Sequence, residues 1–386
     1  MDHDWLVVGA GFTGATLAER LASQLDQRVL VVDRRSHMAG NAFDGPGPDG
    51  RPIHHYGAHI FHTVSDRVWA YLSQFTRWRP YEHRVLGSID GKLVPIPFNL
   101  TSLHALVPER RATAIEHRLL AEIGSGGTIP VLTLLEHPDP LLRGLGDFVY
   151  EKVFSNYSAK QWGLRPDQLD RSVTGRVPVV VSHDDRYFHD RHQAMPADGY
   201  VAMFERMLKH PNIDVLLDTD HRDVLGRVGQ ARTVFTGPID EYFGNRYGAL
   251  PYRSLDFRHE AAAVEFAQPV AVVNHPEAEG FTRILEHKHL TGVTSATTVL
   301  TTEWPQDHVP GVNDPYYPVP RPENRSLHAR YLELARDTDP EVVFAGRLAD
   351  YKYYNMDQAV SRALLVFRGL VPGTLRRRPH MSETSM

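Results

Sequence analysis

The stretch WLVVGAGFTGATLAERLASQLDQRVLVVDRR, residues 5–35, decides the fold of this chain. An apolar strand is followed by a glycine turn, an amphipathic helix and a second apolar strand that ends at Asp33. Gly9, Gly11 and Gly14 form a GxGxxG pattern between the first strand and the helix, the context that this motif requires. The first glycine permits a tight turn, the second lets the backbone approach a pyrophosphate, and the third brings the helix against the strand. The pattern predicts a Rossmann-like, dinucleotide-binding βαβ unit.

The helix and Asp33 supply the groups that such a ligand needs. The N-terminal amides and the positive dipole end of the helix attract phosphate oxygens. Asp33 follows the glycines by about twenty residues, where a carboxylate accepts hydrogen bonds from ribose hydroxyls. The alternative is a glycine turn with a purely structural role.

Composition limits the remaining possibilities. With 386 residues the chain exceeds the usual size of one hydrophobic core, so two or three packed units are expected. A net charge of -5 provides no broad basic field for nucleic acid, and a small anionic ligand would need a local cluster of arginines. The absence of cysteine excludes disulfides, thiolate metal sites and a cysteine nucleophile. No apolar run is long enough to cross a bilayer, and the first buried strand, at residues 5–8, leaves no room for a signal peptide, so we expect a cytoplasmic protein without a membrane partner.

The pattern changes after the first unit. Residues 85–97 alternate around Asp90-Gly91, a preferred hairpin turn, and Pro95 and Pro97 confine the second arm to a sheet edge. Residues 102–162 have helical spacing, interrupted at glycines and prolines. Strand-like stretches, read together as a second, antiparallel sheet, follow at residues 177–181, 214–217, 233–236, 261–273, 283–289 and 293–302. The strand VVFAG and the helix MDQAVSRALLVFRGL then suggest a return to the nucleotide domain.

These patterns predict an α/β fold: a discontinuous Rossmann-like, FAD-type domain with a helical bundle and an antiparallel sheet domain. The Rossmann-like domain is assigned residues 1–77, 199–239 and 335–370, and the helical domain residues 100–171. The sheet domain is assigned residues 78–99, 172–198 and 240–334, and the tail at 371–386 is expected to be disordered.

Aromatic residues and arginines gather in short polar connections, in NYSAKQWG, DDRYF, LPYRS, FTRILEHKHL and PYYPVPRPEN. Arginine forks match phosphate oxygens bidentately, while tyrosines stack on a base and offer a hydroxyl to a phosphate. The set favours a nucleoside diphosphate clamp over the alternative of surface ion pairs and core tyrosines.

The motifs YGAHIFHT, PIPFNL, KQWG, FTGPIDEYF, LPYRSL, FTRILEHKHLTG, PYYPVPRPEN and GRLADYKYYNMDQA, with those above, resemble the UDP-galactopyranose mutase family in order over residues 5–370. The resemblance implies reduced FAD as cofactor and a nucleotide-sugar substrate, UDP-galactose in the first instance. It also implies interconversion of pyranose and furanose forms, with N5 of the reduced flavin as the nucleophile at the anomeric carbon.

The resemblance assigns residues by motif. Catalytic roles are implied for Arg176, on a loop over the diphosphate, and for Arg253, Arg283, His59 and His62. Substrate contacts are implied for Asn99, Tyr157, Trp162, Tyr187, Tyr317, Tyr353 and Asn355. Cofactor contacts are implied for Gly9, Gly11, Gly14, Asp33, Gly40, Asn41, Gly346, Arg347 and Asp357.

Departures from the family pattern keep alternatives open. Ala39 stands where the family has a glycine, Asp350 and Lys352 replace threonine and arginine, and Val180 replaces an arginine. No metal site is otherwise expected, but Asp350 raises the alternative of a flavin-independent mutase that acts on a GDP-sugar with Mg²⁺ or Mn²⁺ as Lewis acid.

Two further classes of protein share the opening motif. One is an FAD-dependent oxidoreductase of the amine-oxidase kind, and the other is a nucleotide-binding protein without catalysis. Among partners, the sequence favours a nucleotide sugar and no nucleic acid, and it leaves open whether the chain forms a homodimer.

Overall fold

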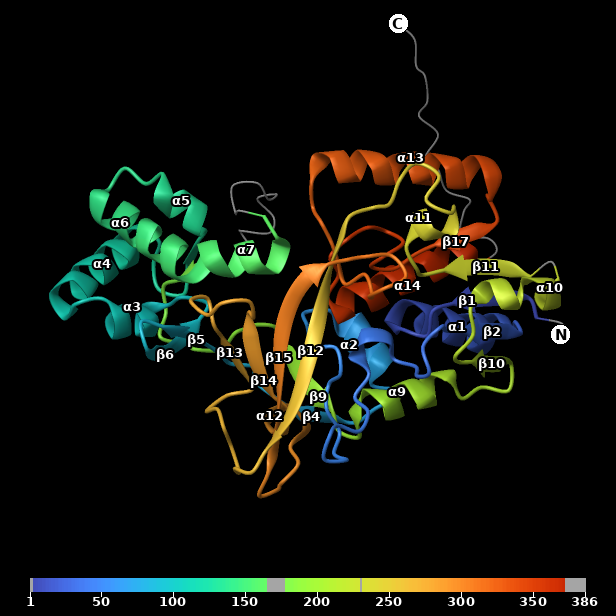
Figure 1. Ribbon diagram of the computed structural model, residues 1–386, viewed down its shortest axis with the longest axis horizontal. Coiled ribbons are helices and arrows are strands. Elements are labelled where there is room, and N and C mark those ends of the chain that lie inside the picture. The colour runs from blue at the N-terminus through green and yellow to red at the C-terminus, as the bar shows by residue number, and fades with distance from the viewer. Residues whose placement is uncertain (1–2, 165–177, 230, 372–386) are drawn as a thin grey trace, which may run out of the picture.

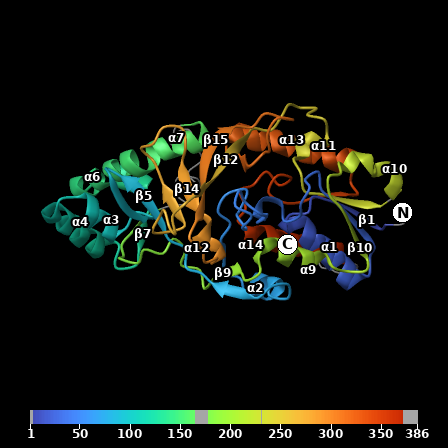
Figure 2. The same cartoon turned by 60° about the horizontal axis from the view of Figure 1, so that its bottom comes forward.

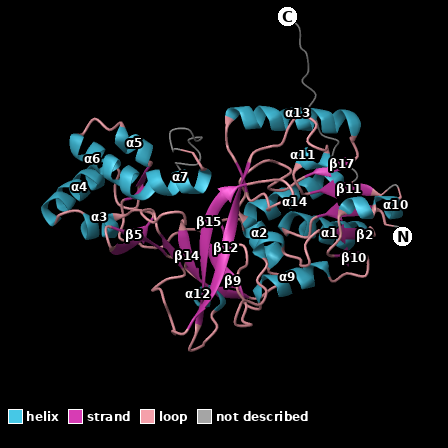
Figure 3. Ribbon diagram, in the orientation of Figure 1, coloured by secondary structure: helices cyan, strands magenta, loops and turns pink. Residues whose placement is uncertain are grey.

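The computed structural model describes residues 3–164, 178–229 and 231–371. Three regions follow one another along the longest axis of the molecule (Figure 1). A group of helices lies at one end, long antiparallel strands cross the middle, and a parallel sheet with its covering helices lies at the other end. Figure 3 shows the same division by colour, with β12 and β15 in magenta between the two helical regions.

The parallel sheet has the order β10-β2-β1-β11-β17. Its strands are β1 (Trp5–Val8), β2 (Val29–Val32), β10 (Ile213–Leu216), β11 (Arg232–Phe235) and β17 (Val342–Phe344). Helices α1 (Phe12–Leu25), α9 (Gly199–Leu208) and α14 (Met356–Leu370) lie on one side, and α10 (Leu225–Val228), α11 (Ile239–Tyr242) and α13 (Pro322–Thr338) on the other (Figure 2). Helices on both faces of a parallel sheet confirm the Rossmann-like prediction.

Two strands assigned by pattern to the antiparallel sheet belong here instead. β10 pairs in parallel with β2, and β11 pairs in parallel with β1 and β17. Apolar alternation alone cannot tell which sheet a short strand joins, because its partners are distant in sequence. The proposed domain division, which gave residues 199–239 to the Rossmann-like domain, already had both strands in this body; its boundaries stay predictions.

The second large sheet has the order β16-β12-β15-β14-β13-β5-β6. Its strands are β5 (Val85–Ile89), β6 (Lys92–Ile96), β12 (Tyr252–Ala262), β13 (Val272–Asn274), β14 (Arg283–Glu286), β15 (Thr298–Asp307) and β16 (Tyr317–Pro318). All neighbouring pairs of this sheet are antiparallel except β13 with β5. The predicted hairpin is confirmed: Asp90 and Gly91 have φ of 48° and 73°, and β6 forms the sheet edge.

Several predicted strand limits in this sheet are wrong. The predicted strand at 261–273 is interrupted, because the buried carboxylate of Glu286 accepts the backbone amides of Ala267 and Gln268 and folds this segment into a loop. The predicted strand at 283–289 ends at Glu286, where α12 (His287–Thr291) begins. β15 begins at Thr298 rather than at residue 293.

The predicted helical region is confirmed and has its own core, formed by residues such as Leu103, Ile115 and Leu142. It contains α3 (Leu100–Leu106), α4 (Glu109–Glu122), α5 (Val131–Leu135), α6 (Pro140–Val149), the π-helix η2 (Tyr150–Ser155) and α7 (Asn156–Trp162). The small pair β7 (Thr128–Ile129) and β8 (Val179–Val180) accompanies these helices. The described part of the predicted strand at 177–181 therefore does not join the large antiparallel sheet, contrary to the prediction.

A separate three-stranded sheet lies outside the two large sheets. It has the order β3-β9-β4, from β3 (Phe61–Thr63), β9 (His192–Pro196) and β4 (Trp78–Pro80), beside α2 (Asp66–Leu72). Two 3-10 turns, η1 (Gly40–Ala42) and η4 (His221–Asp223), flank the parallel sheet. Over the described ranges, the helices are all too short or too polar to span a bilayer.

Candidate active site

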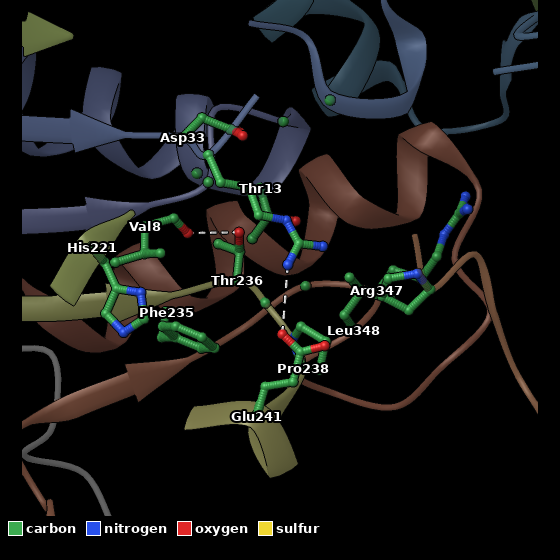
Figure 4. Close-up of a pocket in the computed structure, with 18 of the residues that line it drawn as sticks. Val8, Thr13, Asp33, His221, Phe235, Thr236, Pro238, Glu241, Arg347 and Leu348 are labelled. Atoms are coloured by element: carbon green, nitrogen blue, oxygen red, sulfur yellow. Dashed lines mark hydrogen bonds and ion pairs between the residues drawn. The ribbon is translucent and has the colours of Figure 1, made fainter. Parts of the chain in front are cut away.

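A cavity of about 770 Å³ lies at the carboxyl ends of the parallel strands; we call it the first cavity (Figure 4). Ligands of open α/β sheets bind at this edge. Of the nine residues predicted to contact a cofactor, the first cavity is lined by Gly9, Gly11, Gly14, Asp33, Gly40, Asn41, Gly346 and Arg347. Asp357 does not line it; its carboxylate accepts from the Thr63 hydroxyl at 2.9 Å and from a backbone amide of its own helix.

The glycines form a cradle that side chains would fill. A Cβ at Gly14 would lie 1.9 Å from the Gly9 carbonyl oxygen, and a Cβ at Gly9 would lie 2.1 Å from the Thr236 hydroxyl. A Cβ at Gly40 would lie 3.1 Å from the Gly11 Cα, so these two backbones approach closely at the cavity wall. The cradle fits a dinucleotide pyrophosphate, which needs a bare backbone beside a helix N-terminus.

Asp33 and Ala39 complete the turn. The Asp33 carboxylate accepts the amides of Ala10 at 2.8 Å and Arg35 at 2.9 Å, which holds it at the cavity edge with acceptor capacity to spare. Ala39 has a left-handed φ of 73°, the conformation that glycine favours, and is only 1% exposed. The Ala39 methyl group is therefore buried in a left-handed conformation, at a conformational cost of about 1 kcal/mol.

Charged and aromatic side chains line the far end of the first cavity. Glu241, labelled in Figure 4, forms an ion pair with Arg34 at 3.6 Å. His221 and Phe235 lie together there, with ring centroids 5.2 Å apart. The Thr236 hydroxyl donates to the Val8 carbonyl at 2.7 Å and ties β11 to β1 at the floor.

A second cavity, of about 490 Å³, lies between the helical region and the antiparallel sheet. It is lined by predicted residues His59, His62, Tyr157, Trp162, Tyr187, Arg283, Tyr317, Tyr353 and Asn355, and by Arg347. His59, Arg347, Asn355 and Met356 line both cavities, so the two cavities share a wall.

Arg283 is held by a buried carboxylate. Its Nε donates to the Glu303 carboxylate at 2.7 Å, and Glu303 is 1% exposed while the Arg283 side chain stays 25% exposed. Burial alone would lower the pKa of Arg283, but the attraction of Glu303 and of nearby tyrosine hydroxyls raises its pKa well above the ordinary value. The guanidinium is a fixed cation with donors left for an anionic ligand.

The two predicted histidines differ in environment. His59 donates from Nδ1 to the Gly57 carbonyl at 3.0 Å, and burial lowers its pKa to about 4, so its other ring nitrogen is a neutral acceptor. His62 pairs through Nδ1 with the Asp190 carboxylate and stacks on Phe188, with ring centroids 3.6 Å apart.

Aromatic rings form one wall of the second cavity. Tyr317 and Tyr353 stack with centroids 4.9 Å apart, and Trp162 lies 5.9 Å from Tyr317. The guanidinium carbon of Arg347 lies 5.7 Å from the Tyr353 ring. Burial raises the pKa of Tyr157 to about 12, so its hydroxyl stays a neutral donor.

Two further predicted residues, Arg253 and Asn99, lie elsewhere. Arg253, predicted to contact phosphate, lines neither cavity; it donates to the carbonyls of Gln161 and Lys160 at 3.0 and 3.2 Å and pairs with Asp307. Asn99 is 2% exposed and caps α3 by accepting from the Ser102 amide, which leaves its substrate role without support. Arg176 lies outside the described residues.

Asp350 also lines neither cavity. Arg362 donates to both of its oxygens at 2.9 Å, so the carboxylate has a cation of its own. In the described parts of the chain, no three histidine, aspartate or glutamate side chains are arranged to hold a metal ion. Lys352 and Val180 line neither cavity either.

Sequence reasoning missed two amide side chains. Gln161 and Asn274 line the second cavity, and each has a buried carbonyl oxygen without a hydrogen-bond partner. Gln161 lies within the quoted KQWG motif, which could have indicated it. Asn274 is a lone asparagine at a strand end and carries no pattern of its own.

A Rossmann-like cavity that shares a wall with an arginine- and tyrosine-lined cleft defines a dinucleotide-dependent enzyme that acts on an anionic substrate. The UDP-galactopyranose mutase family model matches residues 152–353, and a model of NAD(P)-binding Rossmann-like domains matches residues 7–75. The chain is 34% identical to a probable UDP-galactopyranose mutase of Klebsiella pneumoniae, over 93% of this chain and 92% of that one. It belongs to the UDP-galactopyranose mutase family.

A second relative and one solved structure are also similar to this chain. The chain is 30% identical to the dTDP-fucopyranose mutase of Escherichia coli, over 93% of this chain and 96% of that one. The crystal structure of a reduced UDP-galactopyranose mutase superposes with a TM-score of 0.71 at 15% identity, covering 96% of this chain and 94% of that one.

The family is one of isomerases, and the Rossmann-like domain of this chain supports FAD as its cofactor. It favours the mutase interpretation over the amine-oxidase-like and metal-assisted alternatives.

Proposed function

We propose that the first cavity holds FAD and that the second cavity binds a nucleoside diphosphate hexose, whose pyranose and furanose forms the enzyme interconverts. UDP-galactose is the first candidate substrate. The observation that carries the proposal is the wall shared by the two cavities, because it brings the end of the cofactor and the sugar to the same residues, His59 and Arg347. When bound and reduced, the flavin supplies a nucleophilic nitrogen for the anomeric carbon.

The side chains of this chain bind the substrate, stabilise the charge of the leaving diphosphate and exclude water. Arg283 binds the diphosphate and, as a fixed cation, stabilises its charge as it leaves the sugar. Tyr317 and Tyr353 donate hydroxyl protons to phosphate oxygens, and their stacked rings exclude water from the cleft. His59, neutral above about pH 4, accepts a hydrogen bond at the shared wall without adding charge.

The base is assigned to the part of the cleft beside η2 and α7. Tyr157 offers a ring face, and the unpartnered amide oxygens of Gln161 and Asn274 can accept from the polar edge of a base. Buried acceptors left unpaired by a wrong base would disfavour its binding. Because a family relative is named for a dTDP-sugar, uridine and thymidine diphosphate sugars should be compared directly.

The test has a cofactor arm and a substrate arm. Purified protein titrated with FAD should take on a bound-flavin visible spectrum, and after reduction with dithionite it should convert UDP-galactose to a product whose five-membered ring is read by NMR. dTDP- and GDP-sugars are assayed alongside. Protein that binds no flavin, or that turns over none of these sugars when reduced, would overturn the proposal.

A cytoplasmic location and a homodimer belong to the same proposal. Cell fractionation and sedimentation at several protein concentrations test them. Recovery with membranes, or a monomer at every concentration, would contradict the corresponding part.

A further inference from the structure

The turn at residues 346–355 supplies side chains to both cavities. Gly346 and Tyr354 line the first cavity, Tyr353 lines the second, and Arg347 lines both. A turn that carries so many cavity residues needs contacts that hold its shape. Within the turn, the side chain of Asp350 is 13% exposed and lines neither cavity, so it is available for such contacts.

Asp350 binds the turn at both ends. Its carboxylate accepts the Gly346 backbone amide at 3.1 Å and the Tyr354 hydroxyl at 3.2 Å. The carbonyl of Tyr354 in turn accepts from the Arg347 guanidinium at 2.8 Å. The carboxylate therefore holds Gly346, which precedes Arg347 in the chain, and Tyr354, whose carbonyl binds the Arg347 guanidinium.

Arg362 fixes the carboxylate from helix α14. Its Nε and Nη2 each donate at 2.9 Å, one to each Asp350 oxygen, in the fork geometry that orients a carboxylate. The pair is neutral as a unit, so it adds no net negative charge beside an anionic reduced cofactor. The charge of the Asp350 carboxylate is thereby neutralised within its own contacts.

We propose that Asp350 is a positioning residue for the cofactor: together with Arg362 it holds the 346–355 turn so that Arg347 and Tyr354 meet the bound FAD. The inference rests on the proposed function, namely that the first cavity binds FAD. It differs from a plain ion pair in one respect. The carboxylate must stand on the turn and the guanidinium on the helix, because only the carboxylate can accept from the Gly346 amide and the Tyr354 hydroxyl.

This asymmetry defines the experiment. Asp350→Asn loses the fork with Arg362, and the dissociation constant for FAD, measured by titrating apoprotein and following flavin fluorescence, should rise by about tenfold. The exchanged pair Asp350→Arg with Arg362→Asp restores opposite charges but offers no acceptor to the turn. It should recover part of the melting temperature lost in Asp350→Asn, while FAD binding stays weakened.

Asp198→Asn is the matched control, because Asp198 pairs with Arg206 at 2.6 Å and lines neither cavity. It should bind FAD as the wild type does. Tyr354→Phe removes one hydroxyl and tests the contact if Asp350→Asn does not fold; we expect FAD binding weakened by about threefold.

The outcomes separate the inference from the function beneath it. Wild-type protein that binds no FAD overturns the proposed function and this inference together. Wild-type protein that binds FAD, with Asp350→Asn or Tyr354→Phe binding it equally well, overturns the inference alone. Full recovery of FAD affinity in the exchanged pair would also overturn it, since an ion pair of either orientation would then suffice.

Discussion

Arg283 combines two properties at the scale of one residue: it lines the second cavity, and its Nε is held by the buried carboxylate of Glu303. A guanidinium fixed in this way can meet a diphosphate without losing side-chain freedom on binding. Its removal affects both ligand and fold, because Glu303 would be left buried and unpaired. The two effects must be measured apart.

We predict that Arg283→Ala lowers kcat/KM for the nucleotide sugar on the order of 100-fold or more, which corresponds to about 3 kcal/mol. Steady-state kinetics of the reduced enzyme measure this value. The single variant should also be destabilised by about 3 to 5 kcal/mol, because an uncompensated charge is left buried.

A paired variant separates binding from stability. Arg283→Met with Glu303→Gln removes both charges and should regain most of the free energy of unfolding, yet stay as inactive as Arg283→Ala. Arg258→Ala removes an exposed arginine that pairs with Asp256 and lines neither cavity, so its kinetics should match the wild type. Wild-type turnover in the paired variant would exclude Arg283 from substrate binding.

At the scale of elements, two cationic side chains, Lys160 and Arg253, hold the C-terminal end of helix α7 in place. Lys160, in its last turn, donates to the carbonyls of His275, Ala278 and Phe281 at 2.6, 2.7 and 2.8 Å. Arg253 donates to the carbonyls at the end of the same helix, where the dipole favours a cation. The helix is thereby tied to the β13–β14 loop and to β12, with Trp162 held against the aromatic wall.

We predict that Lys160→Met lowers the free energy of unfolding by about 2 kcal/mol, because three partly buried carbonyls lose their donor. KM should rise by about tenfold as Trp162 loses its fixed position. Burial lowers the pKa of Lys160 to about 8, so the wild-type KM should rise above pH 8, where the ammonium loses its proton, while the KM of the variant stays flat.

Lys152→Met is the matched control for Lys160→Met. Lys152 reaches the same loop through Glu277, but from an exposed position, so its loss should leave the melting temperature and KM unchanged. Equal effects of Lys152→Met and Lys160→Met would show that a lysine contact with the β13–β14 loop, rather than the three carbonyl contacts of Lys160, decides the result.

The sequence predicted the features of the fold that depend on neighbouring residues alone. The βαβ unit and the Asp90-Gly91 hairpin follow from spacing and turn chemistry, and the structure confirms both. Sheet membership was harder, since β10 and β11 are short apolar strands whose partners come from distant segments. Arg253 shows the same limit within the site: its motif indicated a phosphate ligand, but its partners are main-chain carbonyls that no sequence pattern marks.

At the scale of the whole molecule, buried histidines connect segments that are far apart in the sequence. His54, His59 and His83 are only 2%, 9% and 4% exposed. His54 Nδ1 accepts the backbone amide of His59 at 3.1 Å, and His287 Nδ1, from the antiparallel sheet region, accepts the amide of His54 at 3.0 Å. A nitrogen that accepts cannot carry a proton, so these contacts require the rings of His54 and His287 to be neutral.

This arrangement predicts unfolding in mild acid. Burial lowers the pKa of His54 to about 3, of His59 to about 4 and of His83 to about 3, whereas all three have ordinary values near 6.5 in the unfolded chain. Between pH 6.5 and these folded values the unfolded state binds more protons, so stability is full above pH 6.5 and falls as the pH falls. Each histidine should cost about 2 kcal/mol between pH 7 and pH 5.

Urea unfolding at pH 7, 6 and 5 measures the slope. His54→Asn keeps an acceptor for the His59 amide but cannot be protonated in this range, so its loss of stability on acidification should be smaller by about 2 kcal/mol. His117→Asn replaces an exposed histidine on α4 and should leave the slope unchanged. A wild-type free energy of unfolding that stays constant from pH 7 to pH 5 would contradict the prediction, because the three buried rings would then take up protons without destabilising the fold.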